Sequence, residues 1–286
     1  MKSFIKIISV PLLLATLCIQ TNPARAQDGM AASDNAATGI HATVEEHAPG
    51  AKNEGWRVML GAGPYVRPTY EGSNRYTVVP VPVINATYKD RLSINARGLS
   101  VYWHDEHVRL GTGLTYKGGR KDRKSGSFLS RGDDRLIGMG NVGAAMGVRV
   151  FGSYTIEHVK LSTAVTQYTG GNHGLLVDAA ASLPLKMTDR LILRPRVNVT
   201  WANGTYMQTF FGVTTTQAAN SRFTQFNAGA GLKDVSIGLN ANYGLDRNWF
   251  LGFNADIKRL TGDAAKSPVS LSNVQIIMIS MLGYKF

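Results

Sequence analysis

From Trp56 to the C-terminus, apolar and polar residues alternate along much of the chain. In the segment 107–116, for example, Leu110 and Leu114 share one face and Arg109 lies on the other. The same alternation runs through three later segments, 191–201, 234–245 and 249–258. A period of two is the repeat of a β-strand whose faces meet different surroundings, and about ten residues suffice for a tilted strand to cross a bilayer. This pattern predicts an all-β protein built from membrane-spanning strands.

The energy of a charge in lipid indicates which face of each strand points outward. An arginine or lysine that faces lipid near the middle of the membrane costs roughly 2–4 kcal/mol. Several strands carry a basic residue on the polar face, and an outward orientation would add this cost for each of them. We therefore predict a closed barrel with polar faces inside. Its basic lumen residues are Arg109, Arg149, Lys160, Arg194, Arg196 and Lys258.

The number of strands follows from the starts of the alternating segments. They begin near Trp56, Thr77, Arg91, His107, Met139, Glu157, Gly174, Arg190, Phe223, Val235, Trp249 and Asn273. This predicts a transmembrane antiparallel up-and-down barrel of about twelve strands, an even number as single-chain bacterial barrels have. Ten strands stay possible, because the segments from Thr77 and Phe223 are irregular. Pro80 and Pro82 cannot donate to a strand ladder, so they predict a bulge or an irregular strand.

The N-terminus has the features of a secretory signal. Two lysines precede an apolar run, and residues 24–26 read Ala-Arg-Ala, the small-x-small form that signal peptidase cuts. We expect a signal peptide at 1–26 and a mature chain that starts at Gln27. Residues 27–55 show no apolar period and are predicted to be a flexible periplasmic tail, followed by the barrel at 56–286.

The last strand ends on an aromatic residue. Leu282, Tyr284 and Phe286 share one face and end at a free carboxylate, which resembles the signal that outer-membrane assembly machinery reads. Together with the predicted signal peptide, this ending indicates the outer membrane of a Gram-negative-type cell. Outer-membrane lipid, lipopolysaccharide and the barrel-assembly machinery are the expected partners.

Composition and motifs argue against catalysis and against nucleic acid as a partner. The net charge is +12, but an exported protein meets lipopolysaccharide phosphates rather than nucleic acid. The only cysteine, Cys18, lies within the predicted signal peptide. The His-x-Ser and Asp-x-His arrangements of outer-membrane hydrolases are missing, as are phosphate-loop, zinc and calcium patterns. The acidic and histidine residues at 104–107 are expected to form a solvated turn. We predict no enzyme activity, no cofactor and no metal.

The basic lumen leaves two interpretations open. Arginine and lysine side chains raise the local anion concentration, so the barrel could be a narrow, anion-preferring pore or small-solute channel. A small barrel can instead fill its interior with side chains, and the charges would then pair with acids such as Asp178 and Asp256.

Three stretches resemble motifs of the MipA/OmpV outer-membrane family. Residues 63–73 read GPYVRPTYEGS, residues 206–214 read YMQTFFGVT, and residues 260–268 read LTGDAAKSP. They follow the family's order and bracket the predicted barrel. The motif-loop residues are Arg67, Pro68, Tyr70, Glu71, Gly72, Ser73, Tyr206, Gln208, Phe211, Gly212, Gly262, Asp263, Ser267 and Pro268. One departure is Lys266, where the family often has an acid.

The resemblance implies a protein that holds partners and performs no chemistry of its own. The family's named member interacts with a membrane-bound lytic transglycosylase and is thought to link it to a bifunctional penicillin-binding protein. The expected function is therefore a scaffold for the enzymes that hydrolyse and synthesise murein, the peptidoglycan of the cell wall. The alternatives are the pore described above and a surface adhesin or antigen. The motif loops could close the barrel or form a docking surface.

Overall fold

The computed structural model describes residues 55–124, 132–170 and 174–286. The predicted signal peptide and residues 27–54 of the predicted tail lie outside the described residues. The strands are β1 (Trp56–Pro68), β2 (Tyr76–Tyr88), β3 (Leu92–Asn95), β4 (Gly98–His104), β5 (Val108–Lys117), β6 (Ala145–Ile156), β7 (Val159–Thr169), β8 (Leu175–Ser182), β9 (Leu185–Lys186), β10 (Leu191–Ala202), β11 (Gly231–Gly244), β12 (Trp249–Leu260) and β13 (Val274–Lys285). The helical segments are η1 (Asp134–Leu136), α2 (Gly204–Phe211), α3 (Thr215–Asn220) and α4 (Gly262–Lys266). In this part of the chain, no helix has the length and apolar character needed to cross a membrane.

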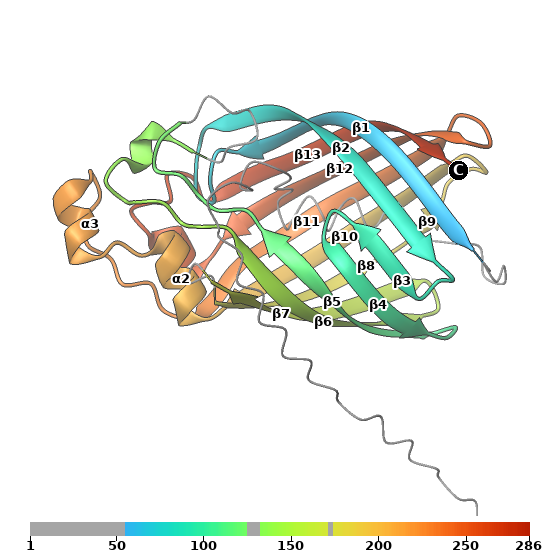
Figure 1. Ribbon diagram of the computed structural model, residues 1–286, viewed down its shortest axis with the longest axis horizontal. Helices are drawn as coiled ribbons and strands as arrows, with labels where there is room; N and C mark the ends of the chain where they lie inside the picture. The colour runs from blue at the N-terminus through green and yellow to red at the C-terminus, as the bar shows by residue number, and fades with distance from the viewer. Residues whose placement is uncertain (1–54, 125–131, 171–173) are drawn as a thin grey trace, which may run out of the picture.

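The strands form one antiparallel sheet that closes on itself (Figure 1). β11 pairs with β12 on one side and with β10 on the other, and this second pairing closes the barrel. β8 and the two-residue β9 pair with successive parts of β10, so they share one position in the wall. Over the described residues the barrel has twelve strand positions, which confirms the predicted fold class.

Two of the predicted strands are wrong, and their errors cancel. The segment predicted from Arg91 is a hairpin of two strands, β3 and β4, joined at Ala96 and Arg97. β3 has four residues, too few to reveal a period of two. Phe223 starts no strand, because it is buried among loop residues and β11 begins only at Gly231. Met139 is likewise a buried loop residue ahead of β6.

The prolines of β2 do not disturb the strand. Every residue from Tyr76 to Tyr88 pairs with β1 in a single register. The predicted bulge or irregularity at Pro80 and Pro82 is therefore wrong. Because neighbouring residues direct their backbone groups to opposite edges of a strand, a proline is tolerated where its nitrogen points away from the partner.

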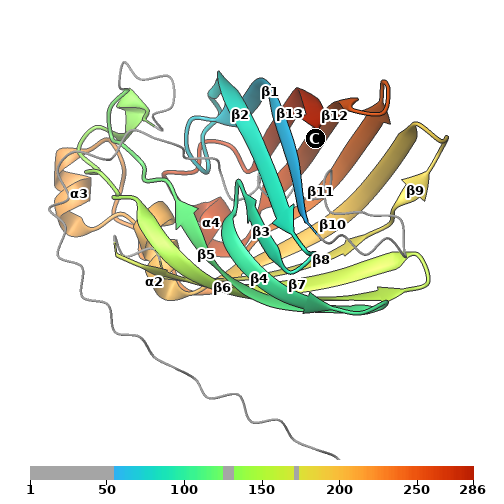
Figure 2. The ribbon, with the colours of Figure 1, turned by 45° about the vertical axis from the view of Figure 1, so that its right-hand side comes forward.

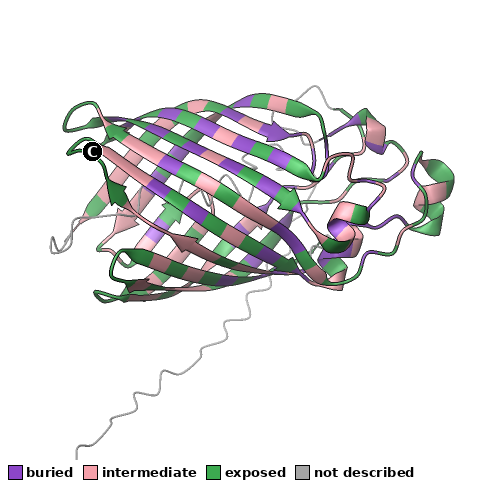
Figure 3. Cartoon of the chain, turned by 180° about the vertical axis from the view of Figure 1, so that it is seen from behind, coloured by how far each residue is buried: buried purple, intermediate pink, exposed green. Residues whose placement is uncertain are grey.

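Buried and exposed residues alternate along the strands (Figure 3). The outward side chains are apolar; Val150 and Ile237 are each 59% exposed on the surface that lipid covers. The inward side chains include buried polar residues such as Arg194, Asn254 and Lys258. This arrangement satisfies the backbone within the sheet and keeps charge out of lipid.

The two ends of the barrel differ. At one end the strands are joined by short turns, and the C-terminus lies there (Figure 1). The other end carries the longer connections with α2, α3 and α4, and Figure 2 shows these helices together at that end. Outer-membrane barrels have short periplasmic turns and longer external loops. By this rule the loop end faces outward and the short-turn end faces the periplasm.

Candidate functional site

The three stretches that resemble family motifs meet at the loop end. They cover the end of β1 with its loop (63–73), α2 with the turn after it (206–214), and α4 with its flanks (260–268). The Tyr206 hydroxyl donates to Glu71 Oε2 (2.8 Å), and the Ser267 hydroxyl donates to the carbonyl oxygen of Phe211 (2.5 Å). We call this layer of loops the cap; it comprises residues 69–75, 132–144, 203–230 and 261–273.

Glu71 links the cap to the barrel wall. Lys233 Nζ donates to Glu71 Oε1 (2.7 Å) and also lies 2.7 Å from Asp234 Oδ2. Lys258 Nζ lies 3.4 Å from the same Asp234 oxygen and 4.0 Å from Glu71 Oε1. Burial alone would raise the pKa of Glu71, but the ammonium groups of Lys233, Lys117 and Lys258 together hold it well below its usual value. The carboxylate therefore stays ionised, and the buried charges compensate one another.

A second polar cluster ties the first motif to the connection between β5 and β6. Arg135 Nη2 donates to Ser73 Oγ (2.8 Å) and to Asp133 Oδ2 (2.9 Å). Thr69 Oγ1 donates to the same carboxylate oxygen (2.8 Å). Burial acts to raise the pKa of Asp133, but hydrogen bonds from Arg135 and Thr69 outweigh it and lower that pKa to about 2. Asp133 is thus an ionised, nearly buried acceptor that organises the loop.

Three further motif residues also make hydrogen bonds within the cap. The Tyr70 hydroxyl donates to the Val269 carbonyl (3.2 Å), while Gln208 and Asp263 accept from the backbone N–H groups of Ala228 and Gly229 (2.9 and 2.8 Å). The others lie at the ends of elements: Arg67 and Pro68 at the end of β1, Gly212 after α2, Gly262 at the start of α4, and half-buried Pro268 after it.

One motif glycine is required by its backbone. Gly72 has φ +94°, a conformation that L side chains rarely adopt. A Cβ atom built there would lie 2.7 Å from Ser270 Oγ and 2.9 Å from Ser270 Cα. The loop after β1 therefore approaches the loop before β13 closely enough to exclude a side chain.

Apolar packing completes the cap. Tyr206, Met207 and Phe211 of the α2 segment have no exposed surface and pack with Leu260 and Ala264. A separate cluster joins Tyr70 and Leu136 to Val213, Phe223 and Val269. The loops thus form a folded layer with its own core over this end of the barrel.

Sequence reasoning missed Lys233, the residue closest to Glu71. Strict alternation would point Lys233 and Asp234 to opposite faces, yet both are buried. The register between β10 and β11 shifts at Thr200 and Trp201, so β11 carries one extra residue there. Such a bulge re-aims a side chain. Two adjacent charged residues at a strand start were the available signal, but only the pairing identifies the bulge.

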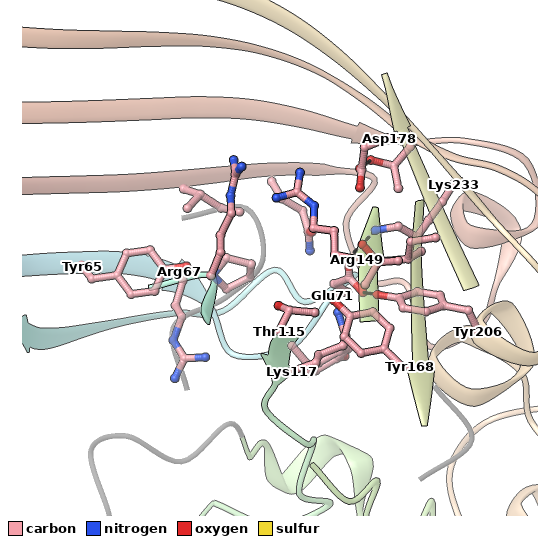
Figure 4. A pocket seen from close by; sticks show the side chains of 18 residues that line it. Tyr65, Arg67, Glu71, Thr115, Lys117, Arg149, Tyr168, Asp178, Tyr206 and Lys233 are labelled. Atoms are coloured by element: carbon pink, nitrogen blue, oxygen red, sulfur yellow. Dashed lines mark hydrogen bonds and ion pairs between the residues drawn. The ribbon is translucent and has the colours of Figure 1, made fainter. Parts of the chain in front are cut away.

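The part of the lumen that the described residues form includes two cavities, which we call the upper and lower cavities. The lower cavity, of about 190 Å³, is lined by all but one of the predicted lumen residues, Arg109, Arg149, Lys160, Arg194 and Arg196. The upper cavity, of about 90 Å³, lies toward the cap and is lined by Glu71, Lys117, Arg149, Tyr206 and Lys233, among others (Figure 4). Lys258 lines neither cavity and belongs to the charge network around Glu71. Arg97, which sequence reasoning missed, lines both.

Some lumen charges are paired with the acids that the filled-barrel interpretation names. Arg196 Nη2 lies 2.5 Å from Asp256 Oδ2 and donates to Asn254 Oδ1 (2.8 Å). Asp178 accepts from the Thr200 hydroxyl (2.9 Å). The described lining of the lower cavity nevertheless includes six basic side chains and one acidic side chain, Asp178. The lumen is therefore partly filled and carries a positive potential.

One side of the lumen is apolar. Tyr65, Val79, Val83, Phe250 and Ile277 point inward from β1, β2, β12 and β13 and are nearly fully buried. Their strands adjoin one another in the sheet. The interior thus has an apolar wall and a basic wall, a division that the alternating pattern alone does not reveal.

The short-turn end carries the aromatic C-terminus. The rings of Trp249 and Tyr284 are 5.0 Å apart, and those of Tyr284 and Phe286 are 4.8 Å apart. Leu282 and Phe286 point outward, with 47% and 71% of their surface exposed. Aromatic rings at the ends of the strands are typical of the membrane–water interface of a membrane barrel.

Among the described residues, no three histidine, cysteine, aspartate or glutamate side chains gather as a metal site. In the turn at 104–107, Asp105 Oδ1 accepts from the backbone N–H groups of His107 (2.9 Å) and Val108 (2.7 Å). This carboxylate therefore shapes an exposed turn.

A closed antiparallel barrel with apolar outer faces, polar inner faces and an aromatic interface defines the class: an outer-membrane β-barrel. The chain belongs to the family described as MltA-interacting protein MipA, which it matches over residues 60–286. This match confirms the predicted family. No curated protein matched the sequence.

Solved outer-membrane barrels are similar in fold. An outer-membrane channel of the COG4313 group from Pseudomonas putida F1 has 12% identity and a TM-score of 0.43, over 84% of this chain and 100% of that chain. The translocator domain of the autotransporter NalP from Neisseria meningitidis has 10% identity and a TM-score of 0.37, over 88% and 94%. OmpT of Vibrio cholerae has 9% identity and a TM-score of 0.36, over 84% and 100%.

Proposed function

We propose that the protein is a non-enzymatic outer-membrane scaffold that links a murein hydrolase and a murein synthase through its periplasmic end. The family takes its name from an interaction with MltA, and that interaction is the functional starting point. A lytic transglycosylase and a bifunctional penicillin-binding protein are the partners we expect for this chain.

The observation that carries the proposal is that the side chains of the motif loops are buried inside the cap. Tyr206 and Phe211 are fully buried and Ser267 is 3% exposed, so their side chains hold the cap together and are not displayed to a partner. The cap also lies at the end that faces outward, whereas murein lies in the periplasm. A partner that acts on murein is therefore expected at the short turns, and the periplasmic tail predicted from the sequence is a further expected contact.

The short-turn end has suitable polar groups. Exposed residues of both signs project there from the turns, including Glu106, Asp189, Arg190 and Arg247. The side chain of Asp189 is 96% exposed. Mixed charges on exposed turns favour an association with a fast, salt-sensitive on-rate.

The test is an affinity pull-down of the mature protein from its own envelope. We expect recovery of a lytic transglycosylase and a penicillin-binding protein, and loss of both after deletion of 27–54 or in the charge-reversal variant Asp189→Lys/Arg190→Glu. The matched control is Thr216→Ala in α3, at the opposite end, which is expected to retain both partners. Recovery of the barrel with its assembly machinery but without murein enzymes would contradict the scaffold.

A second candidate function is a narrow anion-preferring pore, which the six basic residues around the lower cavity favour. Planar-bilayer recordings test it. Stable conductance steps with anion selectivity, lowered in Arg194→Gln, would favour the pore. A silent bilayer that contains folded protein would count against it.

A further inference from the structure

The hydrogen-bonded wall of the barrel is interrupted beside β2. β2 pairs with β1 along its whole length, but it pairs with β3 only at Ala86–Tyr88. On the far side of the β3–β4 hairpin, β5 pairs with β4 only as far as Leu114. Residues 76–85 of β2 and 115–117 of β5 thus have no strand partner on these facing edges within the described chain. We call this place the seam; in Figure 2 the hairpin stops short of the loop end that β2 reaches.

The prolines of β2 lie on the seam. Alternate residues of a strand direct their N–H and C=O groups to the same edge. The N–H of Lys89 donates to the carbonyl oxygen of Gly55 (3.1 Å), in register with the pairing of β1 and β2, so odd-numbered residues of β2 direct their backbone groups to β1. Even-numbered residues, which include Pro80 and Pro82, direct theirs to the other edge. Pro80 also stands opposite Pro64 of β1, where neither residue has an N–H to offer. The nitrogens of Pro80 and Pro82 therefore face the seam. This edge lacks two N–H donors that another strand would need. This edge is unsuited to pairing with a partner's β-strand.

Behind the seam the lumen is amphipathic. Val79 and Val83 point inward from β2 and belong to the same apolar cluster as Tyr65 and Ile277. Tyr65 and Ile277 also line the upper cavity. Across that cavity lie Arg97 at the tip of the hairpin, Lys117 at the edge of β5, and Arg149 of β6 (Figure 4 labels the last two). The cavity thus joins an apolar wall to a cluster of cations, and its lining also contains the carboxylates of Glu71 and Asp178.

A buried donor points to an acceptor ligand. Gln275 lines the upper cavity and is 1% exposed, and within the described structure its Nε2 atom has no hydrogen-bond partner. The Nδ2 atom of Asn85, at the lower end of the seam, is in the same situation and Asn85 is 3% exposed. A buried donor without a hydrogen-bond partner destabilises the folded protein until it meets an acceptor. Gln275 lies with the guanidinium and ammonium groups in the lining of the upper cavity, and together they favour an anion with several oxygen atoms, whereas Asn85 lines neither cavity.

We propose that the upper cavity binds the headgroup of an anionic amphiphile, such as a phosphate-bearing lipid, that arrives sideways from the outer leaflet through the seam. About 90 Å³ equals the space of roughly three water molecules, which suits a phosphate but not a hydrocarbon chain as well. The chain of the ligand lies along Val79 and Val83 and leaves through the seam into lipid. Within the described chain the folded cap lies over the outer end of the lumen, and the seam offers a lateral route from lipid beside it.

The experiment uses a lysophosphatidic acid with a photoreactive diazirine in its acyl chain, added to liposomes that contain the mature full chain. The comparison probe carries the same chain on a phosphocholine headgroup, and inorganic phosphate is the competitor. We expect the anionic probe to label inward residues of β1 and β2, including Tyr65 and Val79, roughly tenfold above the zwitterionic probe.

Variants tie the label to the cavity. Arg97→Gln/Arg149→Gln is expected to lower the labelling to the zwitterionic level, whereas Arg91→Gln, in an exposed turn at the other end, retains it. Heat-modifiable migration on gels reports whether each barrel is folded. Gln275→Leu, which keeps a side chain of similar size, is the second variant if the double variant does not fold.

Two outcomes would overturn the proposal. Equal labelling by both probes, confined to outward residues, would mean ordinary lipid contact. Binding of inorganic phosphate without acyl labelling of the interior would mean a free-anion site with no lateral route. Neither outcome bears on the pull-down of murein enzymes, so this inference and the scaffold can fail independently.

Discussion

The cap and the seam border the same cavity, but they are built in opposite ways. The cap closes one end through compensated buried charges, a glycine contact and its own apolar core. The seam keeps part of the side wall unpaired through a short hairpin and two prolines that donate no hydrogen bonds. Closure therefore depends on many specific side chains, whereas the unpaired edge depends on the length of one hairpin and on two missing donors.

The largest expected effect comes from Glu71→Gln, which leaves Lys233 and Lys258 buried without a full countercharge. Removing one partner of a buried ion pair costs about 3–5 kcal/mol, and the lower value applies because the Glu71 side chain is 21% exposed. We expect rapid proteolysis within 203–230 in an otherwise intact barrel. Glu106→Gln, in an exposed turn, is the control. The added substitution Lys258→Met should restore resistance; unchanged proteolysis of the single variant would refute the role of Glu71.

Gly72→Ala is expected to be next in size. The new Cβ atom meets Ser270 in a backbone conformation that alanine avoids, so we expect a loss of about 2–3 kcal/mol of cap stability. Hydrogen exchange of the backbone in 261–273 measures it. Gly231→Ala is the matched control, since a Cβ atom there meets nothing within 4 Å. Equal exchange in both variants would show that the close approach is unimportant.

Acid should loosen the Asp133 cluster. The pKa of Asp133 is lowered from 3.8 to about 2 in the folded protein. A lowered carboxyl pKa contributes stability above the unfolded value, and that stability is lost as pH falls through the folded value. We expect about 2 kcal/mol to disappear between about pH 4 and pH 2, seen as faster hydrogen exchange in 132–141. Asp133→Asn should be loose already and nearly independent of pH in this window; a pH response equal to that of the native protein would argue against this carboxyl.

The smallest effect on stability is expected at the seam. Pro80→Thr/Pro82→Thr restores two edge donors while the pairing of β2 with β1 stays intact, so unfolding should shift by less than about 0.5 kcal/mol. The new donors should promote edge-to-edge association of barrels, which chemical cross-linking in detergent detects. Pro64→Thr, whose nitrogen faces β13, is the control. Monomeric double-variant barrels would show that the prolines do not guard this edge.

Part of the site could be predicted from sequence. The alternating pattern correctly indicated the strand class, and the energy of charge in lipid gave a reason to expect Arg149 and Arg194 inside, where both line the lower cavity. The motif resemblance correctly identified the family. Lys233 and Arg97 were not foreseen, because each acquires its role from a neighbour on another segment of the chain.

The sequence by itself determined that this chain is an outer-membrane barrel, since a period of two is local and lipid acts on every strand in the same way. Only the tertiary structure decided where the wall is interrupted, how a bulge turns Lys233 inward, and that the motif loops close the barrel. The prolines illustrate the division. Their missing donors can be read in the sequence, but the edge that lacks them depends on which strand lies beside β2.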